Sequence, residues 1–234
     1  MTFRLMRVLV FVAEFAMAQS APVFSWQFDR DTEISQHRIV ANDITQSGLP
    51  LAALTVSAWV RIDAPAEWGG IVSALQDNGA YERGWFLGYH KDRFCIALAS
   101  ATSKKLTYLN ADRPFDAGLW HYLVGSYDGR ELRIFVDGKP AGSSSAQSGD
   151  ILYPPKGVVA LGAYVDDNET YRMQGALAEI AIWDRAMPGD EVASAFDARK
   201  AEFPDFQDEP KEITGWPTHR RDIARSGHSP TPLT

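Results

Sequence analysis

The stretch WHYLVGSYDGRELRIFVDGKPAG, residues 120–142, carries the strongest structural signal in this chain, because two Asp-Gly pairs divide it. Asp-Gly supplies the positive φ angles of a tight type I′ turn, so Asp128-Gly129 and Asp137-Gly138 each predict a point where one strand folds back on the next. Between the turns the side chains alternate, with Leu132, Ile134 and Val136 on one face and Glu131, Arg133 and Phe135 on the other. This period of two predicts a half-buried strand in an antiparallel β-meander.

Segments of the same kind occur at short intervals along the chain. They are rich in β-branched and aromatic residues and are separated by Gly, Pro, Asp or Asn, which is typical of strands and their turns. The predicted strands are residues 26–29, 54–62, 70–75, 85–89, 94–99, 106–110, 121–127, 132–136, 158–162 and 176–183. Their number and spacing favour an all-β, two-sheet sandwich. One short helix is predicted after Pro188, where Asp190 and Glu191 fall in the first turn and an apolar stripe continues toward Lys200.

The composition limits the classes of partner. A chain of 234 residues with 45% hydrophobic residues can form one large β-domain with a sizeable core. The formal charge of -7 argues against nucleic acid as a partner and is compatible with a cation at a carboxylate cluster. Cys95 is the single cysteine, which excludes an internal disulfide and a thiolate zinc site, and its apolar neighbours predict a buried strand position.

The two ends of the chain differ from the middle. Residues 1–20 resemble a secretory signal, with Arg4 and Arg7 before an apolar run and Ala16-Met17-Ala18 as a cleavage site, although Glu14 interrupts the run. The alternative is a cytoplasmic chain with an apolar start, and the run is too short to span a membrane. Residues 21–202 form the predicted domain, and residues 203–234 are a Pro-rich linker or tail that could begin a further domain.

Ordered blocks across residues 28–201 resemble the laminin-G-like (concanavalin A-like lectin/glucanase) domains. The blocks are residues 54–60, 69–73, 84–88, 120–138, 161–163 and 175–187. The resemblance implies a two-sheet antiparallel jelly-roll sandwich with one short C-terminal helix. It implies a calcium ion at a loop edge less directly, because the acidic pair of the closing strand is reduced here to Ala178-Glu179. Residues 216–230 are similar to the opening of quinoprotein-like (PQQ-like) β-propellers, with an ordinary C-terminal tail as the alternative.

The jelly-roll that the resemblance implies also supports glycoside hydrolases. These enzymes carry paired carboxylates on one strand face, whereas Glu131 is followed two residues on by Arg133, and Glu179 by Ala181. The sequence also contains no Gly-x-Ser-x-Gly elbow, no His-Glu-x-x-His motif and no phosphate-binding glycine loop. We therefore expect no enzymatic activity and keep a glycoside hydrolase as an alternative.

Two inter-strand loops repeat the pattern Asp-Asn-x-x-Tyr, at residues 77–81 and 167–171, and could meet at one rim of the sandwich. Carboxylate and amide oxygens are hard ligands suited to Ca²⁺. The candidate metal ligands are Asp77, Asp166, Asp167 and Asn168, with Asp29 and Glu179 as a second candidate pair on the terminal strands. For each of these residues the alternative is a plain turn former or surface carboxylate.

The same loops carry aromatic residues that could stack on sugar rings. The candidate ligand-binding residues are Asp77, Asn78, Tyr81, Arg83, Trp85, Tyr164, Asn168 and Tyr171. Trp59, Trp120 and Trp183 are expected in the core, His121 is expected to be packed and hydrogen-bonded, and Trp68 is expected to be exposed in a loop.

These observations favour a non-catalytic binding module that recognises a glycan or an extracellular protein through loops 76–84 and 164–173, with Ca²⁺ as a candidate cofactor. The apolar N-terminal pattern favours a secreted, periplasmic or cell-surface location. The alternative is an accessory domain that packs against a neighbouring domain of a longer chain and has no soluble ligand.

Overall fold

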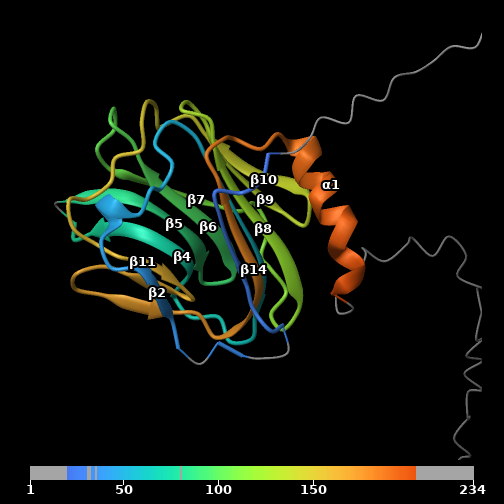
Figure 1. Cartoon of the computed structure of the whole chain (residues 1–234). Coiled ribbons are helices and arrows are strands. Elements are labelled where there is room, and N and C mark those ends of the chain that lie inside the picture. Colours follow the sequence, from blue (N-terminus) through green and yellow to red (C-terminus); the bar gives the residue numbers. More distant parts are fainter. Residues whose placement is uncertain (1–19, 31–32, 35, 80, 204–234) are drawn as a thin grey trace, which may run out of the picture.

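The computed structural model describes residues 20–30, 33–34, 36–79 and 81–203, and every structural statement below concerns these residues. Two twisted sheets pack face to face, and one helix lies against the outside of one of them (Figure 1). The predicted antiparallel jelly-roll sandwich with a C-terminal helix is confirmed. None of the helices in these segments is long and apolar enough to cross a membrane.

The six-stranded sheet joins the first and last strands of the domain. Its strands, in spatial order, are β1 (Phe24–Gln27), β14 (Gly175–Trp183), β3 (Leu54–Ile62), β8 (Trp120–Tyr127), β9 (Leu132–Val136) and β10 (Lys139–Ser144), all antiparallel. Trp26 pairs with Ile180, so the N-terminal strand covers the edge of β14 that would otherwise lie open.

The eight-stranded sheet is more irregular. Its main path is β12 (Ala163–Val165), β13 (Thr170–Arg172), β4 (Trp68–Asp77), β5 (Glu82–His90), β6 (Arg93–Ala99) and β7 (Leu106–Asn110), and β11 (Val159–Leu161) pairs with both β4 and β2 (Arg38–Ala41). The contact between β13 and β4 is parallel, and the others are antiparallel. Strands β2, β10, β12 and β13 were not predicted from the sequence.

The main core fills the space between the sheets, and alternation along each strand decides which side chains reach it. Leu132, Ile134 and Val136 of β9 face this core, while Phe135 faces outward, as the sequence predicts. The tight turn at residues 137–138 is confirmed, because Asp137 has φ 53 and Gly138 has φ 75, both positive as type I′ requires.

The turn at residues 128–131 differs from the prediction of a second type I′ turn. Gly129 has φ 85, but Asp128 does not have a positive φ. Instead, Oδ1 of Asp128 accepts hydrogen bonds from the backbone N–H groups of Arg130 (3.0 Å) and Glu131 (2.9 Å). A side-chain-supported Asp turn therefore replaces the two-residue turn at this position.

Helix α1 (Gly189–Arg199) covers the outer face of the six-stranded sheet, and short 3₁₀ turns lie at Ile44–Gln46 and Lys200–Glu202. Phe196 and Phe203 both stack on Trp59, with ring centroids 5.8 and 3.9 Å away. Trp120 is also buried in this layer, and Trp183 is half-buried against it. Phe203 is 2% exposed, so the packed domain extends at least to this residue, one position beyond the boundary predicted from the sequence.

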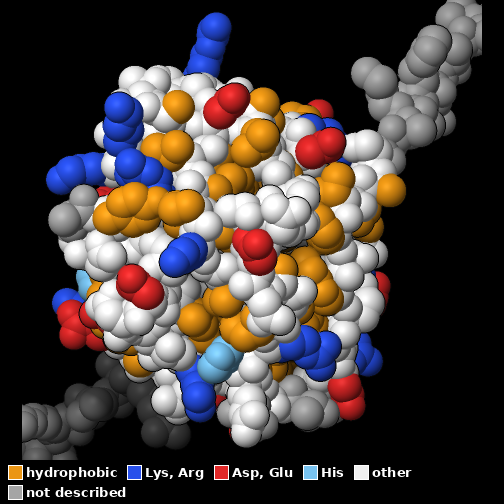
Figure 2. Space-filling model, turned by 60° about the vertical axis from the view of Figure 1, so that its left-hand side comes forward, with side chains coloured by type: hydrophobic (Ala, Val, Ile, Leu, Met, Phe, Trp, Pro, Cys, Tyr) orange, Lys and Arg blue, Asp and Glu red, His pale blue; other side chains and the backbone are white. Residues whose placement is uncertain are grey.

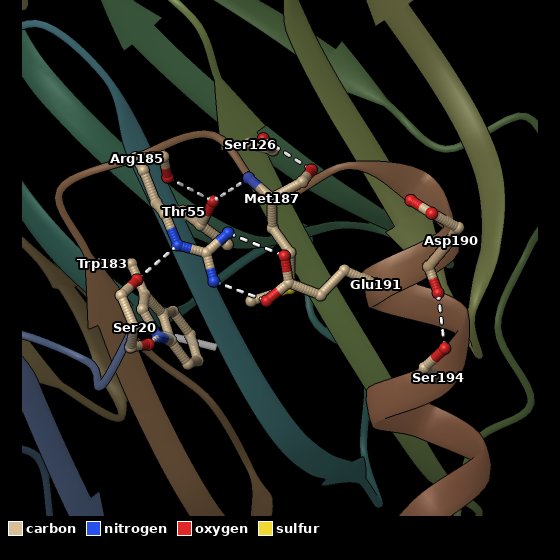
Figure 3. A network of polar contacts seen from close by, with 9 residues as sticks. All are labelled: Ser20, Thr55, Ser126, Trp183, Arg185, Met187, Asp190, Glu191 and Ser194. Carbon is tan, nitrogen blue, oxygen red and sulfur yellow. Dashed lines mark hydrogen bonds and ion pairs between the residues drawn. The ribbon is translucent and has the colours of Figure 1, made fainter. Parts of the chain in front are cut away.

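A polar network holds the start of α1 against the sheet (Figure 3). The guanidinium of Arg185 forms a bidentate ion pair with Glu191 and donates through Nε to Oγ of Ser20. Beneath it, the buried hydroxyl of Thr55 donates to the carbonyl of Arg185 (2.7 Å) and accepts from the backbone N–H of Met187 (2.8 Å). The link from β14 to α1 is therefore fixed by β3.

Candidate ligand-binding site

Helix α1 lies against the six-stranded sheet and leaves the outer face of the eight-stranded sheet uncovered (Figure 1). That face carries a cluster of aromatic side chains. Alternation in β5 sends Trp85 and Leu87 into the core between the sheets and Phe86 to the outer face. Phe86 lies opposite Ala97 of β6, and Ala97 lies opposite Tyr108 of β7. Because Ala97 is small, the large rings on either side of it can approach across the sheet.

These rings surround an open cavity of about 220 Å³, which we call the aromatic cavity. It is lined by Trp68, Asp77, Tyr108, Tyr164, Glu169 and Tyr171. Strand β4 supplies a residue from each of its ends, and a register shift between Gly70 and Val72 interrupts its pairing with β5. Bulges of this kind bend the strand that carries them, so β4 can curve around the cavity.

The aromatic rings support one another. Trp68 stacks on His90, with ring centroids 4.2 Å apart, and meets Tyr108 edge-on at 5.5 Å. Tyr164 and Tyr171 lie 5.5 Å apart on the other side. Trp68, Tyr108 and Tyr171 are half-buried and keep part of their surface exposed. Such contacts orient the rings before any ligand arrives.

Tyrosine hydroxyls bind the carboxylates of the cavity. The hydroxyl of Tyr108 donates to Oδ2 of Asp77, and that of Tyr164 donates to Oδ2 of Asp166 at 3.1 Å. Burial is the main cause that raises the pKa of Tyr108, and the hydrogen bond to Asp77 raises that pKa further. The pKa of Tyr171 is raised chiefly by its hydrogen bond to Glu169. These tyrosines are therefore neutral donors at physiological pH.

The two Asp-Asn-x-x-Tyr loops meet at one rim, as predicted. The backbone N–H of Asp167 donates to Oε1 of Gln76 at 3.1 Å, and Asp77 and Glu169 line the same cavity. Both loops also use their Asp residues as turn formers. Oδ1 of Asp166 accepts hydrogen bonds from the backbone N–H groups of Asn168 (3.1 Å) and Glu169 (2.7 Å). The same carboxylate therefore stabilises the turn and lies at the rim of the candidate site.

The candidate metal ligands are not gathered into a metal centre. In the described segments, no group of three or more His, Cys, Asp or Glu side chains is arranged to hold a metal ion. The terminal strands lie side by side as expected, with Gln27 opposite Glu179. Glu179, however, forms an ion pair with Arg199. Asp29 lines a different cavity, of about 390 Å³, to which Glu179 does not contribute.

Several predicted ligand contacts lie elsewhere. Trp85 is wrong as a stacking platform, because it is 0% exposed and its indole N–H donates to the hydroxyl of Tyr153 at 2.8 Å. Arg83 donates to the carbonyls of Glu82 and Lys104 and lies over the ring of Tyr81, with its guanidinium carbon 4.8 Å from the ring centroid.

Among the other predicted contacts, Asn78 and Asn168 are exposed on the loops, and neither they nor Tyr81 line the aromatic cavity. Asp77, Tyr164 and Tyr171 are the predicted ligand residues that do line it. His121 is buried and hydrogen-bonded to Asp137, as expected.

Sequence reasoning missed two cavity residues. Trp68 was expected in a loop, but it is the first residue of β4, and it was not assigned to the site. Tyr108 was not considered, because β7 lies far from both loops in the sequence. Both residues point outward from strands whose inward side chains are buried. That position can be recognised only when the pairing of β5, β6 and β7 is known.

Figure 2 brings forward the side of the molecule turned away from α1. Hydrophobic side chains lie there in several groups, with acidic and basic side chains scattered between and around them.

Residues 36–193 match the family described as the concanavalin A-like lectin/glucanases superfamily (Laminin_G_3). The chain belongs to this superfamily. The matched region covers the two sheets from β2 to the beginning of α1. It does not reach residues 216–230, which lie outside the described residues, so the comparison gives no support to a propeller at that end.

Curated relatives include pappalysin-1 of Homo sapiens, 29% identical over 167 residues, and pappalysin-1 of Mus musculus, 25% identical over 171 residues. These matches cover 65% and 67% of this chain but 10% of each pappalysin. The chain therefore spans about a tenth of the length of the curated relatives that it matches.

Among solved structures, the chain is similar to the CBM40 of Ruminococcus gnavus IT-sialidase bound to α2,3-sialyllactose (TM-score 0.59, 12% identity, 75% of this chain and 100% of that chain). It is also similar to a putative carbohydrate binding protein of Bacteroides ovatus (TM-score 0.52, 17% identity, 68% of this chain and 44% of that chain). At these identities the likeness shows the shared fold, and the ligand has to be argued from this chain's own residues.

Proposed function

We propose that this domain is a non-catalytic carbohydrate-binding module and that the aromatic cavity is its binding site. The observation that carries the proposal is the meeting of Trp68, Tyr108 and Tyr171 with the carboxylates of Asp77 and Glu169 in one open cavity. Sugar rings present apolar C–H faces and a rim of hydroxyl groups. Half-exposed aromatic rings pack against the faces, and carboxylate oxygens accept hydrogen bonds from the hydroxyls.

The size of the cavity sets the length of sugar that it can hold. Its volume of about 220 Å³ lies below the roughly 300–1,000 Å³ of pockets for drug-sized ligands. One sugar residue therefore occupies the cavity, and further residues of a glycan extend over the rim formed by the loops at residues 77–81 and 167–171.

The similar structures support this choice of ligand class. One of them is a carbohydrate-binding module with a bound trisaccharide, and another is described as a putative carbohydrate binding protein. We further propose an extracellular location, since the N-terminal 20 residues resemble a secretory signal and glycans are displayed on cell surfaces.

The absence of catalysis is part of the proposal. Glycoside hydrolases place two carboxyl groups on either side of the scissile bond, one of them as a protonated acid. Here a tyrosine hydroxyl already donates to one carboxylate oxygen of Asp77 and to one of Asp166, which leaves fewer oxygens free to flank a scissile bond. We expect no release of reducing sugar from any oligosaccharide that binds, and release abolished by Asp77→Asn would contradict a non-catalytic role.

Isothermal titration of the domain with a panel of oligosaccharides tests the proposal. We expect Trp68→Ala to weaken binding by about tenfold or more, since it removes one stacking face of the cavity. Trp183→Ala is the matched control, because Trp183 is also half-buried but lies on the other sheet. Equal affinities for the wild type and Trp68→Ala would contradict the site, and silence toward every glycan would contradict the function.

A second candidate function is an accessory domain that packs against a neighbour in a longer chain. It is favoured by the curated relatives, in which the matched region is a tenth of a much larger protein. Under this hypothesis no oligosaccharide binds, and the Trp68→Ala substitution weakens association with the adjoining domain when both are expressed together.

A further inference from the structure

We propose that the aromatic cavity selects a terminal sugar residue with a protonated amine, as in glycans that end in glucosamine with a free amino group, and rejects carboxylated sugars. This inference rests on the proposed carbohydrate-binding function and names the class of sugar. It follows from three properties of the cavity: its charge, its inventory of donors and acceptors, and its aromatic walls.

The charge of the cavity is negative. Asp77 and Glu169 line it, and Asp166 is bound to Tyr164 at its wall. In the described part of the chain, no Lys or Arg forms an ion pair with any of these carboxylates, and the cavity lining contains no basic residue. A cationic group of a ligand would therefore meet these carboxylates without competition from a basic side chain of the lining.

The hydrogen-bonding groups point to a donor-rich ligand. The hydroxyls of Tyr108 and Tyr164 already donate to carboxylates, so these tyrosines leave mainly acceptors for a ligand. A carboxylate offers about four acceptor positions. Asp77 uses one for Tyr108 and one for the backbone N–H of Gly79, at 3.4 Å. An ammonium group has three donors and no acceptor, which complements this arrangement, whereas a sugar carboxylate would need donors.

The aromatic walls add to the preference for a cation. The faces of Trp and Tyr rings are electron-rich and attract ammonium groups within about 6 Å, more strongly where water is excluded. Trp68, Tyr108 and Tyr171 are all half-buried around one space. Burial is the main cause that raises the pKa of Tyr164, and the hydrogen bond with Glu169 is the main cause that raises the pKa of Tyr171; the negative charge of Asp166 raises both further.

Titration with four ligands of similar length tests the selectivity: a glucosamine oligomer, its N-acetylated form, a neutral cello-oligosaccharide and α2,3-sialyllactose. We expect the glucosamine oligomer to bind about tenfold more tightly than either uncharged ligand, with an affinity that falls as salt is added. We expect no measurable heat with sialyllactose, because like charges would be brought together.

Asp77→Asn and Glu169→Gln remove one negative charge each while keeping the shape of the side chain. We expect each to reduce the ratio of affinities for the glucosamine oligomer and the cello-oligosaccharide by about fivefold, because the ammonium group loses an ionic partner while a neutral hydroxyl loses only a hydrogen-bond acceptor. Asp184→Asn is the matched control, because Asp184 is exposed and directly follows β14 of the other sheet. Glu169 is exposed on its loop, so Glu169→Gln keeps the test valid if Asp77→Asn fails to fold.

The outcomes separate the two proposals. Equal or tighter binding of the neutral sugars, or binding of sialyllactose, would overturn the selectivity and leave the carbohydrate-binding function standing. A preference for the amine that neither charge-removing substitution changes would place the selective site elsewhere and overturn the inference. No binding of any of the four ligands to the wild type would overturn both.

Discussion

Cys95 lies in β6 on the outer face of the eight-stranded sheet, between Gly88 of β5 and Asn110 of β7. Its thiol is 0% exposed, and burial raises its pKa to about 12. Only the thiolate is a good nucleophile, so this cysteine is unreactive for two reasons, its protonation and its lack of access. The single Cys of the chain is therefore a packing residue.

We expect Cys95 to resist Ellman's reagent at pH 8 in the native protein and to react fully once guanidinium chloride unfolds the chain. Burial raises the pKa of this thiol and therefore favours the protonated form throughout the neutral range. The measurement is the absorbance of the coloured thiolate that the reagent releases when the cysteine reacts. Full labelling of the folded protein within minutes would contradict the burial of this side chain.

Single residues also show where local pattern succeeds and where it fails. Asp137-Gly138 forms the turn that the dipeptide predicts, while Asp128-Gly129 does not, because the Asp128 carboxylate finds two backbone N–H partners in a longer turn. Trp85 and Trp68 were both assigned from their neighbours in the sequence. The face of the strand on which each residue lies puts Trp85 in the core and Trp68 at the cavity. Which face is buried depends on how β4 pairs with β5 and how β5 pairs with β6.

At the scale of elements, Thr55 of β3 helps to fix the segment that leads into α1. The hydroxyl of Thr55 serves the carbonyl of Arg185 and the N–H of Met187 in the segment before the helix (Figure 3). We expect Thr55→Val to lower the free energy of unfolding by about 2–4 kcal/mol, since two buried backbone groups lose their partner.

Urea denaturation followed by circular dichroism measures the effect of Thr55→Val. The matched control is Thr102→Val, an exposed position for which we expect a change of no more than about 0.5 kcal/mol. A similar small change for Thr55→Val would show that the segment from Arg185 to Met187 is held by other contacts.

The elements that escaped prediction share a physical reason. Strand β10, KPAGSS, contains no β-branched or aromatic residue and is a strand because β9 offers it a ladder. Strands β12 and β13 have three residues each and pair with one another as a short hairpin. This hairpin joins the sheet where β13 pairs with β4. The β-propensity of individual residues is a weak signal, so the contacts with neighbouring strands decide whether segments this short form strands.

At the scale of the whole molecule, β1 near the N-terminus forms one edge of the six-stranded sheet and pairs with β14, the last strand of the domain. Its residues alternate, with Phe24 and Trp26 packed against the main core and Ser25 exposed. We expect Trp26→Ala to lower the free energy of unfolding by about 2 kcal/mol, because a half-buried ring is removed from the core and the packing that holds β1 on β14 is weakened.

Ser25→Ala, one residue away on the outward face, is the matched control, with an expected change within about 0.5 kcal/mol. Thermal unfolding at two protein concentrations adds a second readout, since a less protected β14 edge favours aggregation. Equal stabilities of the two variants would show that β1 contributes little to the closure of the sandwich.

The role of calcium is a further question at this scale. The expectation of a calcium ion at the loop rim stays a prediction. Ca²⁺ takes 6–8 oxygen ligands, whereas Asp77 and Asp166 here are engaged by tyrosine hydroxyls and backbone N–H groups. We expect the affinity for the glucosamine oligomer to be the same with EDTA as with added CaCl₂. Loss of binding in EDTA would instead support a calcium ion at the loop rim.

Turn chemistry and the alternation of side chains are local properties of the chain. They were enough to predict an antiparallel sandwich, most of its strands and the helix after Pro188. The repeated Asp-Asn-x-x-Tyr pattern also pointed to the rim where the two loops meet. The aromatic cavity needed more, because Trp68, Tyr108 and Tyr171 lie far apart in the sequence and on strands β4, β7 and β13. Only the pairing and register of those strands bring their outward side chains together, since register is set by contacts between segments and not within them.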